Sequence, residues 1–473
     1  MKHQKALFCV LLALFIHAND ASRILGIFPY NGKSHFKMFD VLCRELAKRG
    51  HQVDVIGHFP LKTPLANYTD VVDLNGTLKT VVNGLTTDYG KQIQRSITYY
   101  VATVFGNDLC DLMKQEKMQK FIKNPPNDPP YDLIIVEVNI FKIKRFGQLL
   151  KAPVAIIISS MQMSFVDDIM GNPTSYAFLS GFYNDNAVVD TFFDRLWNFL
   201  INYKNALIFE HYTAEQTDMM KKYLGLPNIP DVRELEKTVS LAIVNSHYSY
   251  YGIRPVTPRC FPDFNVSFRF LTKLRFIFLY AIRCIFQFST KKVSRYLYLK
   301  DNPVSPIKSD QIKGLSDVFL TEHPNTRVFI THGGLMGTQE ATYYGVPMIG
   351  IPVFGDQIKN INILVEKNVA VLVDIDDITE HTMDVALNTK QSLSDTVYYC
   401  FRESAKTMSK MFRDRPMPPL DTAVYWIEYV LRNGPDSLRS AAVKLPWWKL
   451  HLLDVFVFLF ACFTFIIFLT NSL

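Results

Sequence analysis

The chain has 473 residues, of which 48% are hydrophobic and 20% are charged, and its formal net charge is +7. This length predicts two large domains with short additional segments. The positive charge is spread along the chain without a long basic run, so composition argues against nucleic-acid binding and favours an ordinary solvated surface.

The first 22 residues have the features of a secretory signal peptide. Lys2 and Lys5 precede an apolar run at residues 6–16, and small residues follow around Ala18 and Ala21. A membrane anchor is disfavoured because the apolar run is too short to span a bilayer. We therefore expect residues 1–21 to be a signal peptide.

The next segment predicts a β–loop–α–β unit of the Rossmann-like type. Arg23–Phe28 and Gln52–Gly57 are predicted strands, and the helix between them is expected to begin at Ser34 as N-cap and to end near Arg49. His35 lies at the start of this helix, at the sheet edge where ligands bind. The helix dipole there favours a neutral imidazole, which could act as a general base. Position alone nevertheless favours a surface histidine.

The rest of the N-terminal half gives weaker signals. Residues 131–138 predict a strand with Glu137 at its end, residues 86–123 predict helices, and residues 125–130 form a proline-rich turn. Residues 160–223 are rich in Phe, Tyr and Met. They either pack a core or line an apolar acceptor pocket, and both interpretations remain open.

A second β–loop–α–β unit spans residues 328–362, with the sequence VFITHGGLMGTQEATYYGVPMIGIPVFGDQIKNIN. A short β-branched strand ends at His332-Gly333-Gly334, a helix follows up to Tyr344, and a second strand ends at the loop of residues 354–357. Glycines let a backbone approach a phosphate closely, and the helix N-terminus offers N–H groups and positive dipole to an anion.

This second unit resembles the signature of the membrane-bound UDP-glycosyltransferases, and it is most similar to the insect-type branch. The resemblance extends to residues 24–55, 131–159, 242–259 and 421–454. It implies an α/β fold of the GT-B type, in which two Rossmann-like domains face a cleft. Residues 22–255 would form the acceptor-binding domain, and residues 321–445 would form the UDP-sugar-binding domain.

The resemblance also implies roles for individual residues. His35 would be the catalytic base, and Glu137 would orient it, in a position where similar enzymes commonly have Asp. The donor-binding residues would be His332, Gly334 and Gly337 at the diphosphate, Glu340 at the ribose, and Asp356 and Gln357 at the sugar. No Asp-x-Asp cation motif is present, so we expect neither a metal nor a cofactor beyond the UDP-sugar co-substrate.

The resemblance is lost between Cys260 and about His323, where the expected Gly-Ser loop and Trp-x-Pro-Gln stretch are missing. We assign residues 256–320 to an atypical segment that combines the linker with part of the donor domain. An apolar run within it is interrupted by four basic residues, which argues against a membrane span. A basic amphipathic helix on a membrane and a segment from an altered exon are both open, and the second is favoured.

The C-terminus predicts a single transmembrane helix. Residues 452–469 are apolar except for Asp454 and Thr464, and Trp447 and Trp448 precede them as interface aromatics do. With the signal peptide, this places the body of the protein in the lumen of the endoplasmic reticulum. Three sequons are compatible with lumenal glycosylation, at Asn67, Asn75 and Asn265.

The expected function is transfer of a hexose from a UDP-sugar to a hydroxyl of a small lipophilic acceptor, as in detoxification or conjugation. Glucose is the expected hexose, and the transfer is expected to invert the configuration of the anomeric carbon. The alternative is an inactive membrane-anchored homologue with a binding role, because part of the donor domain is atypical. A homo-oligomer is compatible with the sequence.

Overall fold

The computed structural model describes residues 21–78, 87–137, 146–173, 176–225, 238–261, 326, 328–388, 394–450 and 452–472. The predicted signal peptide and most of the atypical segment lie outside the described residues, as does Asn265.

The N-terminal half is built on a seven-stranded sheet in which every pair of neighbouring strands is parallel. The strand order is β3-β2-β1-β4-β5-β6-β7, the order of a doubly wound Rossmann-like sheet extended by one strand. The strands are β1 (Arg23–Phe28), β2 (Gln52–Gly57), β3 (Tyr68–Asp73), β4 (Leu133–Glu137), β5 (Val154–Ile158), β6 (Leu241–Val244) and β7 (Cys260–Phe261).

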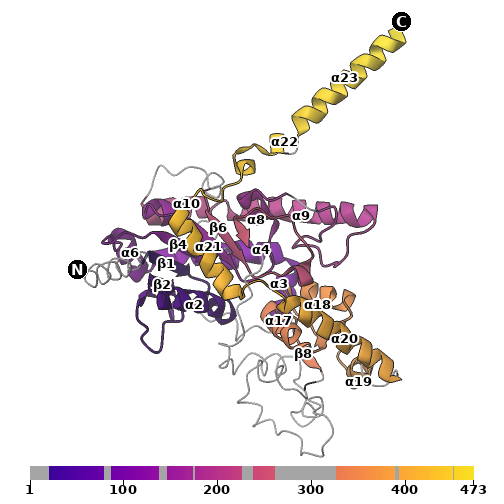
Figure 1. Ribbon diagram of the computed structural model, residues 1–473, viewed down its shortest axis with the longest axis horizontal. Coiled ribbons are helices and arrows are strands. Elements are labelled where there is room, and N and C mark those ends of the chain that lie inside the picture. The colour runs from indigo at the N-terminus through magenta and orange to yellow at the C-terminus, as the bar shows by residue number, and fades with distance from the viewer. Residues whose placement is uncertain are drawn as a thin grey trace, which may run out of the picture.

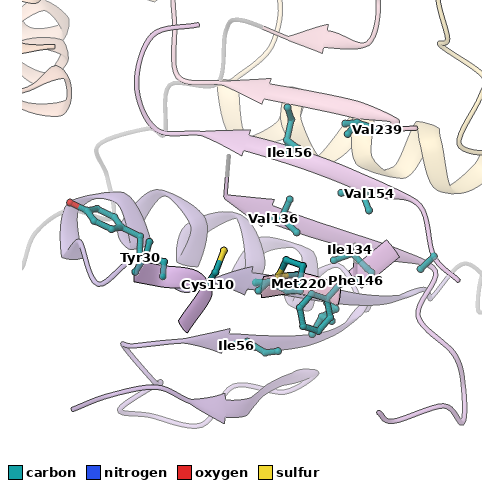
Figure 2. Close-up of a cluster of buried hydrophobic side chains, with 14 of the residues drawn as sticks. Tyr30, Ile56, Cys110, Ile134, Val136, Phe146, Val154, Ile156, Met220 and Val239 are labelled. Carbon is teal, nitrogen blue, oxygen red and sulfur yellow. The ribbon is translucent and has the colours of Figure 1, made fainter. Parts of the chain in front are cut away.

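Both faces of this sheet are buried, as the continuous apolar runs of its strands require. Successive residues of a strand point to opposite faces, so Leu25 and Ile134 pack in one core cluster, while Ile24 and Leu133 pack in the other. Figure 2 shows the first cluster, where Tyr30 and the side chains of several strands gather.

Helices cover the two faces (Figure 1). Helix α2 starts at Lys33 with Gly32 as N-cap, so the expected cap Ser34 lies inside the helix. The helices of this half are α2 (Lys33–Lys48), α3 (Thr87–Arg95), α4 (Ile97–Ala102), the π-helix η1 (Thr103–Asn107), α5 (Asp108–Cys110), the 3-10 helix η2 (Asp111–Lys114), α6 (Glu116–Lys123), α7 (Phe146–Leu149), α8 (Ser164–Met170), α9 (Phe192–Thr213), α10 (Gln216–Leu224) and α12 (Tyr248–Tyr251).

A second parallel sheet, with strand order β10-β9-β8, forms the core of the C-terminal half as far as it is described. Its three strands alternate with helices, as the β–loop–α–β pattern predicts. The elements are β8 (Phe329–Thr331), α17 (Leu335–Tyr344), β9 (Met348–Gly350), α18 (Gln357–Glu366), β10 (Ala370–Leu372), the 3-10 helix η5 (Ile375–Asp377), α19 (Glu380–Asn388) and α20 (Ser394–Arg413).

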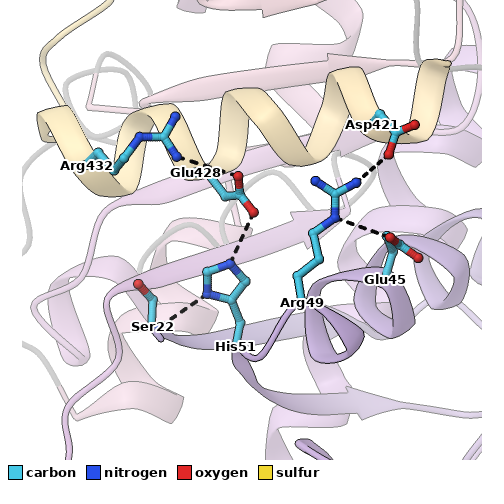
Figure 3. Close-up of polar contacts among 7 residues, drawn as sticks. All are labelled: Ser22, Glu45, Arg49, His51, Asp421, Glu428 and Arg432. Atoms are coloured by element: carbon cyan, nitrogen blue, oxygen red, sulfur yellow. Dashed lines mark hydrogen bonds and ion pairs between the residues drawn. The ribbon is translucent and has the colours of Figure 1, made fainter. Parts of the chain in front are cut away.

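Helix α21 (Pro419–Asn433) leaves the second sheet and packs on the first domain (Figure 1). Its apolar face, with Val424 and Ile427 fully buried, belongs to the same core cluster as strand β1. Polar contacts hold its outer face: Arg49 pairs with Asp421, and His51 Nε2 lies 3.5 Å from Glu428 Oε1 (Figure 3). The chain thus crosses between the domains twice, which ties their positions together.

The chain ends in η6 (Ala441–Lys444), α22 (Trp447–Leu450) and α23 (Leu453–Ser472). Helix α23 extends away from the body, and its apolar side chains are exposed (Figure 1). Within the part of the chain that the structure describes, no helix meets the combined length and hydropathy that a membrane crossing requires. The transmembrane helix expected at residues 452–469 is therefore not confirmed.

Candidate active site

His35 and Glu137 meet at the carboxyl edge of the first sheet. Strands β1 and β4 are parallel neighbours, with Ile27 opposite Val136, so the loop after β1 and the end of β4 share one edge. His35 Nδ1 lies 2.9 Å from Glu137 Oε1, although the two residues are 102 positions apart in the sequence. With Nδ1 engaged, Nε2 is the ring nitrogen that can take a proton.

The surroundings of this pair are buried and aromatic. Burial raises the pKa of Glu137, and the hydrogen bond and charge of His35 lower it part of the way back. The Tyr30 ring lies 4.8 Å from the His35 ring, and the Phe105 ring lies 5.5 Å from Tyr30. The imidazole of His35 therefore contacts both a buried carboxylate and an aromatic ring.

The turn at His332-Gly333-Gly334 leads from β8 into α17. Gly333 has φ +84°, and a Cβ there would lie 2.8 Å from the carbonyl oxygen of Gln357, so only glycine fits. Gly334 is the N-cap of α17 and supplies no side-chain cap, which leaves the first N–H groups of the helix for an anion. Gly337 lies in that first turn.

The His332 ring lies over this helix start, since a Cβ on Gly334 would come within 2.5 Å of His332 Nε2. Burial lowers the pKa of His332 to about 4. At neutral pH this site thus offers a phosphate an N–H group of a neutral imidazole and the dipole of α17, rather than a full positive charge.

Asp356 is the N-cap of α18, and Asn360 holds it in place. Asn360 Nδ2 donates to Asp356 Oδ2 at 3.1 Å and to the carbonyl oxygen of Gly333 at 3.0 Å, so one buried amide joins both glycine-containing loops. Gln357 Oε1 accepts hydrogen bonds from the N–H groups of Val353 and Phe354. Gln357 Oε1 therefore braces its own loop, and the side-chain Nε2 is the atom that Gln357 could offer to a ligand.

The two halves face each other across this site. Burial raises the pKa of Asp356, and the hydrogen bond from Asn360 and then the charge of His35 lower it part of the way back. Tyr251 from the first domain donates to Asn360 Oδ1 at 2.7 Å. Gln94 of α3 accepts from the N–H of Gly355 at 2.8 Å. The structure thus brings His35, Glu137 and Asp356 to one interdomain site.

Comparison with known proteins identifies the family. The family model described as "UDP-glucoronosyl and UDP-glucosyl transferase" matches residues 312–473. The relative "UDP-glycosyltransferase UGT5" of Dactylopius coccus is 30% identical over 96% of this chain and 91% of its own length. The chain belongs to the UDP-glycosyltransferase family. A second relative from the same insect, "UDP-glucosyltransferase 2", is 28% identical over 98% of this chain and 95% of its own length.

The fold of this UDP-glycosyltransferase agrees with the GT-B expectation. The crystal structure of the calicheamicin glycosyltransferase CalG4 has a TM-score of 0.50 to it at 15% identity, covering 87% of this chain and 99% of CalG4. Two parallel sheets with the ligand loops at facing edges are the α/β architecture predicted from the sequence.

The remaining residues predicted for this UDP-glycosyltransferase include both buried and exposed side chains. Glu340 is buried in the middle of α17, whereas the sequon residues Asn67 and Asn75 are exposed on the first domain. Among the described residues, no group of His, Cys, Asp and Glu side chains could hold a metal ion. The roles of these residues and the metal-independent reaction stay predictions.

Two residues of α18 that make contacts at this site were not predicted from the sequence. Asn360 could have been found, because it lies four positions after Asp356 and so shares its helix face. Lys359 gave no such signal. Its ammonium group enters the first domain, where it donates to Ser180 Oγ and to the carbonyl oxygen of Asn184, both at 2.7 Å, and to that of Gly181. Lys359 therefore ties helix α18 to the first domain.

Lys359 should make stability depend on pH. Burial, and then the charge of Arg254, lower its pKa in the folded chain to about 7, while the unfolded value is about 10.4. Between these values the unfolded chain binds the extra proton, so the contribution of Lys359 to stability rises with pH, by at most about 1.4 kcal/mol per pH unit.

The thermal midpoint of the wild type, measured relative to that of Lys359→Met, should therefore rise steadily from pH 7 to pH 9. Lys406→Met provides the control, because Lys406 is exposed and pairs only with its helical neighbour Glu403. Parallel midpoints for the wild type and Lys359→Met across this range would contradict the prediction.

Proposed function

We propose that this UDP-glycosyltransferase transfers glucose from UDP-glucose to a hydroxyl of a small lipophilic acceptor, with inversion at the anomeric carbon. The observation that carries the proposal is the pairing of His35 Nδ1 with Glu137, which leaves Nε2 at the interdomain site. Glucose is the proposed sugar because one insect relative is named as a UDP-glucosyltransferase.

The reaction is a single displacement. The acceptor O–H bond breaks as its proton passes to Nε2 of His35, and the acceptor oxygen bonds to the anomeric carbon. The bond from that carbon to the diphosphate breaks, and its electron pair leaves on UDP. Attack opposite the leaving group inverts the configuration.

The chain's own groups assist each part of this step. Glu137 holds the proton on Nδ1 and stabilises the imidazolium that forms. The N–H groups at the start of α17 and the His332 ring face the diphosphate as its charge grows. Asp356 and Gln357 hold the sugar hydroxyls, and the aromatic wall of Tyr30 and Phe105 favours an apolar acceptor.

The test is product analysis with the full chain in detergent. UDP-glucose and UDP-glucuronate are offered separately with a set of phenols and alcohols that includes 4-methylumbelliferone. We expect β-glucosides and free UDP, and slower turnover of UDP-glucuronate. An α-glucoside would contradict inversion. No turnover in a sample shown to be folded would favour the inactive, membrane-anchored homologue.

We further propose that the body lies in the lumen of the endoplasmic reticulum, with residues 1–21 as signal peptide and residues 452–469 crossing the membrane once. The support is the apolar run of the C-terminus and the exposure of Asn67 and Asn75. In cells, the chain should resist alkaline extraction from membranes. Glycosidase treatment should increase its mobility, and less so for the Asn67→Gln/Asn75→Gln double variant. Release by alkali or an unglycosylated chain would contradict this placement.

A further inference from the structure

A line of buried hydrogen bonds runs from the donor-domain helix α17 to the imidazole of His35. Gln339 Nε2 donates to Asn245 Oδ1 at 3.1 Å, and Asn245 Nδ2 donates to the carbonyl oxygen of Ser159 at 3.0 Å. Ser159 Oγ lies 2.8 Å from His35 Nδ1. Three residues thus connect the two sides of the active site, one from the second domain and two from the first.

The orientation of every amide in this line is determined. A backbone carbonyl can only accept a hydrogen bond, so Asn245 must turn Nδ2 toward Ser159 and Oδ1 toward Gln339. Gln339 must then present its Nε2. All three residues are buried, with Gln339 and Asn245 exposed by only 2% and 1%. A buried amide left without its partner is costly, so the line resists being broken at any one point.

The two ends of the line bear on the reaction. Gln339 lies directly before Glu340 on α17, the helix whose N-terminus faces the predicted diphosphate site. At the other end, Nδ1–H of the neutral His35 ring has two acceptors, the carboxylate of Glu137 and the hydroxyl oxygen of Ser159. Two acceptors fix the ring rotation and keep the proton on Nδ1, which keeps Nε2 free to act as base.

We propose that Ser159, Asn245 and Gln339 are positioning residues that align His35 with the donor helix. This inference rests on the proposed role of His35 as base. Because the line joins the domains, its effect is on the orientation of the base relative to the bound donor and not on donor affinity. A displacement of the base by a fraction of an ångström is enough to slow transfer.

The test compares four variants in the full chain, with UDP-glucose as donor and 4-methylumbelliferone as acceptor. Ser159→Ala and Gln339→Met should each lower kcat about threefold to tenfold, as expected for one lost hydrogen bond, with KM for UDP-glucose unchanged. Ser159→Thr keeps the hydroxyl and should restore most of kcat. The double variant should lose no more kcat than the more damaging of the two single variants, because both changes break one line.

Thr342→Ala is the matched control. Thr342 is buried on the same helix, and its hydroxyl lies 2.5 Å from the hydroxyl of Tyr250 in the first domain, but it has no link to His35. It should lower the thermal midpoint as Gln339→Met does while leaving kcat within about twofold. If Gln339→Met changes kcat no more than Thr342→Ala does, or if the double variant shows the product of the two single losses, the line does not position the base.

His35→Ala, measured in the same series, separates this failure from failure of the proposed function. If His35→Ala turns over normally, the assignment of the base is wrong. If His35→Ala is inactive while Gln339→Met and Ser159→Ala behave like Thr342→Ala, only the positioning line is wrong. Ser159→Ala removes only one oxygen atom and should therefore fold. If Gln339→Met does not fold, Ser159→Ala can still be compared with Thr342→Ala.

Discussion

Replacing His35 with alanine should lower kcat by about 10²- to 10⁴-fold, because the variant has no side chain at this position that can take the acceptor's proton. Donor binding should change little, since the residues predicted to contact the diphosphate and the sugar belong to the second domain. The measurement is glucoside formation from UDP-glucose, accompanied by calorimetry of UDP binding to the same sample. The result would be a chain that binds its donor and does not transfer it.

Two further variants sharpen this expectation. Glu137→Gln keeps the size of the side chain but removes the carboxylate that holds the proton on Nδ1, so kcat should fall between those of the wild type and His35→Ala. His211→Ala is the control, because His211 is exposed on α9 and has no role in the reaction. A His35→Ala variant with normal turnover would exclude His35 as the base.

The second large effect is expected at Asp356. Asp356→Ala should weaken binding of UDP-glucose by about 10- to 100-fold, the cost of a lost hydrogen bond to a charged group, and leave binding of UDP alone nearly unchanged. The reason is that Asp356 is predicted to hold the sugar hydroxyls, whereas the diphosphate faces the start of α17. Calorimetry with the two ligands separates these contributions.

Asp356→Asn provides the structural control for this experiment. An asparagine can still accept the hydrogen bond that Asn360 Nδ2 gives to Asp356, so it keeps the loop in place while it removes the charge. If Asp356→Ala weakens UDP and UDP-glucose by the same factor while Asp356→Asn weakens neither, Asp356 supports the loop and does not hold the sugar.

The electrostatics of the donor site explain how a diphosphate could bind without a metal. Burial lowers the pKa of His332 to about 4, so at neutral pH its favourable contribution is an N–H group beside the dipole of α17. The glycines at 333 and 334 bring these groups close to a ligand. The positive charge of Lys359 is not available to the phosphate, because its three hydrogen bonds are to the first domain.

The sequence by itself determined the local architecture of this protein. Strands buried on both faces must be nearly continuous apolar runs, so β1, β2, β4 and β9 were recognisable from composition and length alone. The turn before α17 could also be predicted, because Gly333 has a positive φ, a backbone conformation that other residues avoid. The resemblance to a known family then supplied the pairing of His35 with Glu137.

Only the tertiary structure decided how the two halves combine. Helix α21 follows the second sheet in sequence yet buries Ile427 against the first, because its apolar face matches the face that α2 leaves uncovered. Ser159, Asn245, Gln339 and Lys359 carry no local pattern, since polar residues look alike in a sequence whether they meet water or another domain. Their partners lie between 86 and 179 positions away, a separation that no periodicity records. Folding of the first domain brings Asn245 to Ser159, and docking of the domains gives Gln339 and Lys359 their hydrogen bonds.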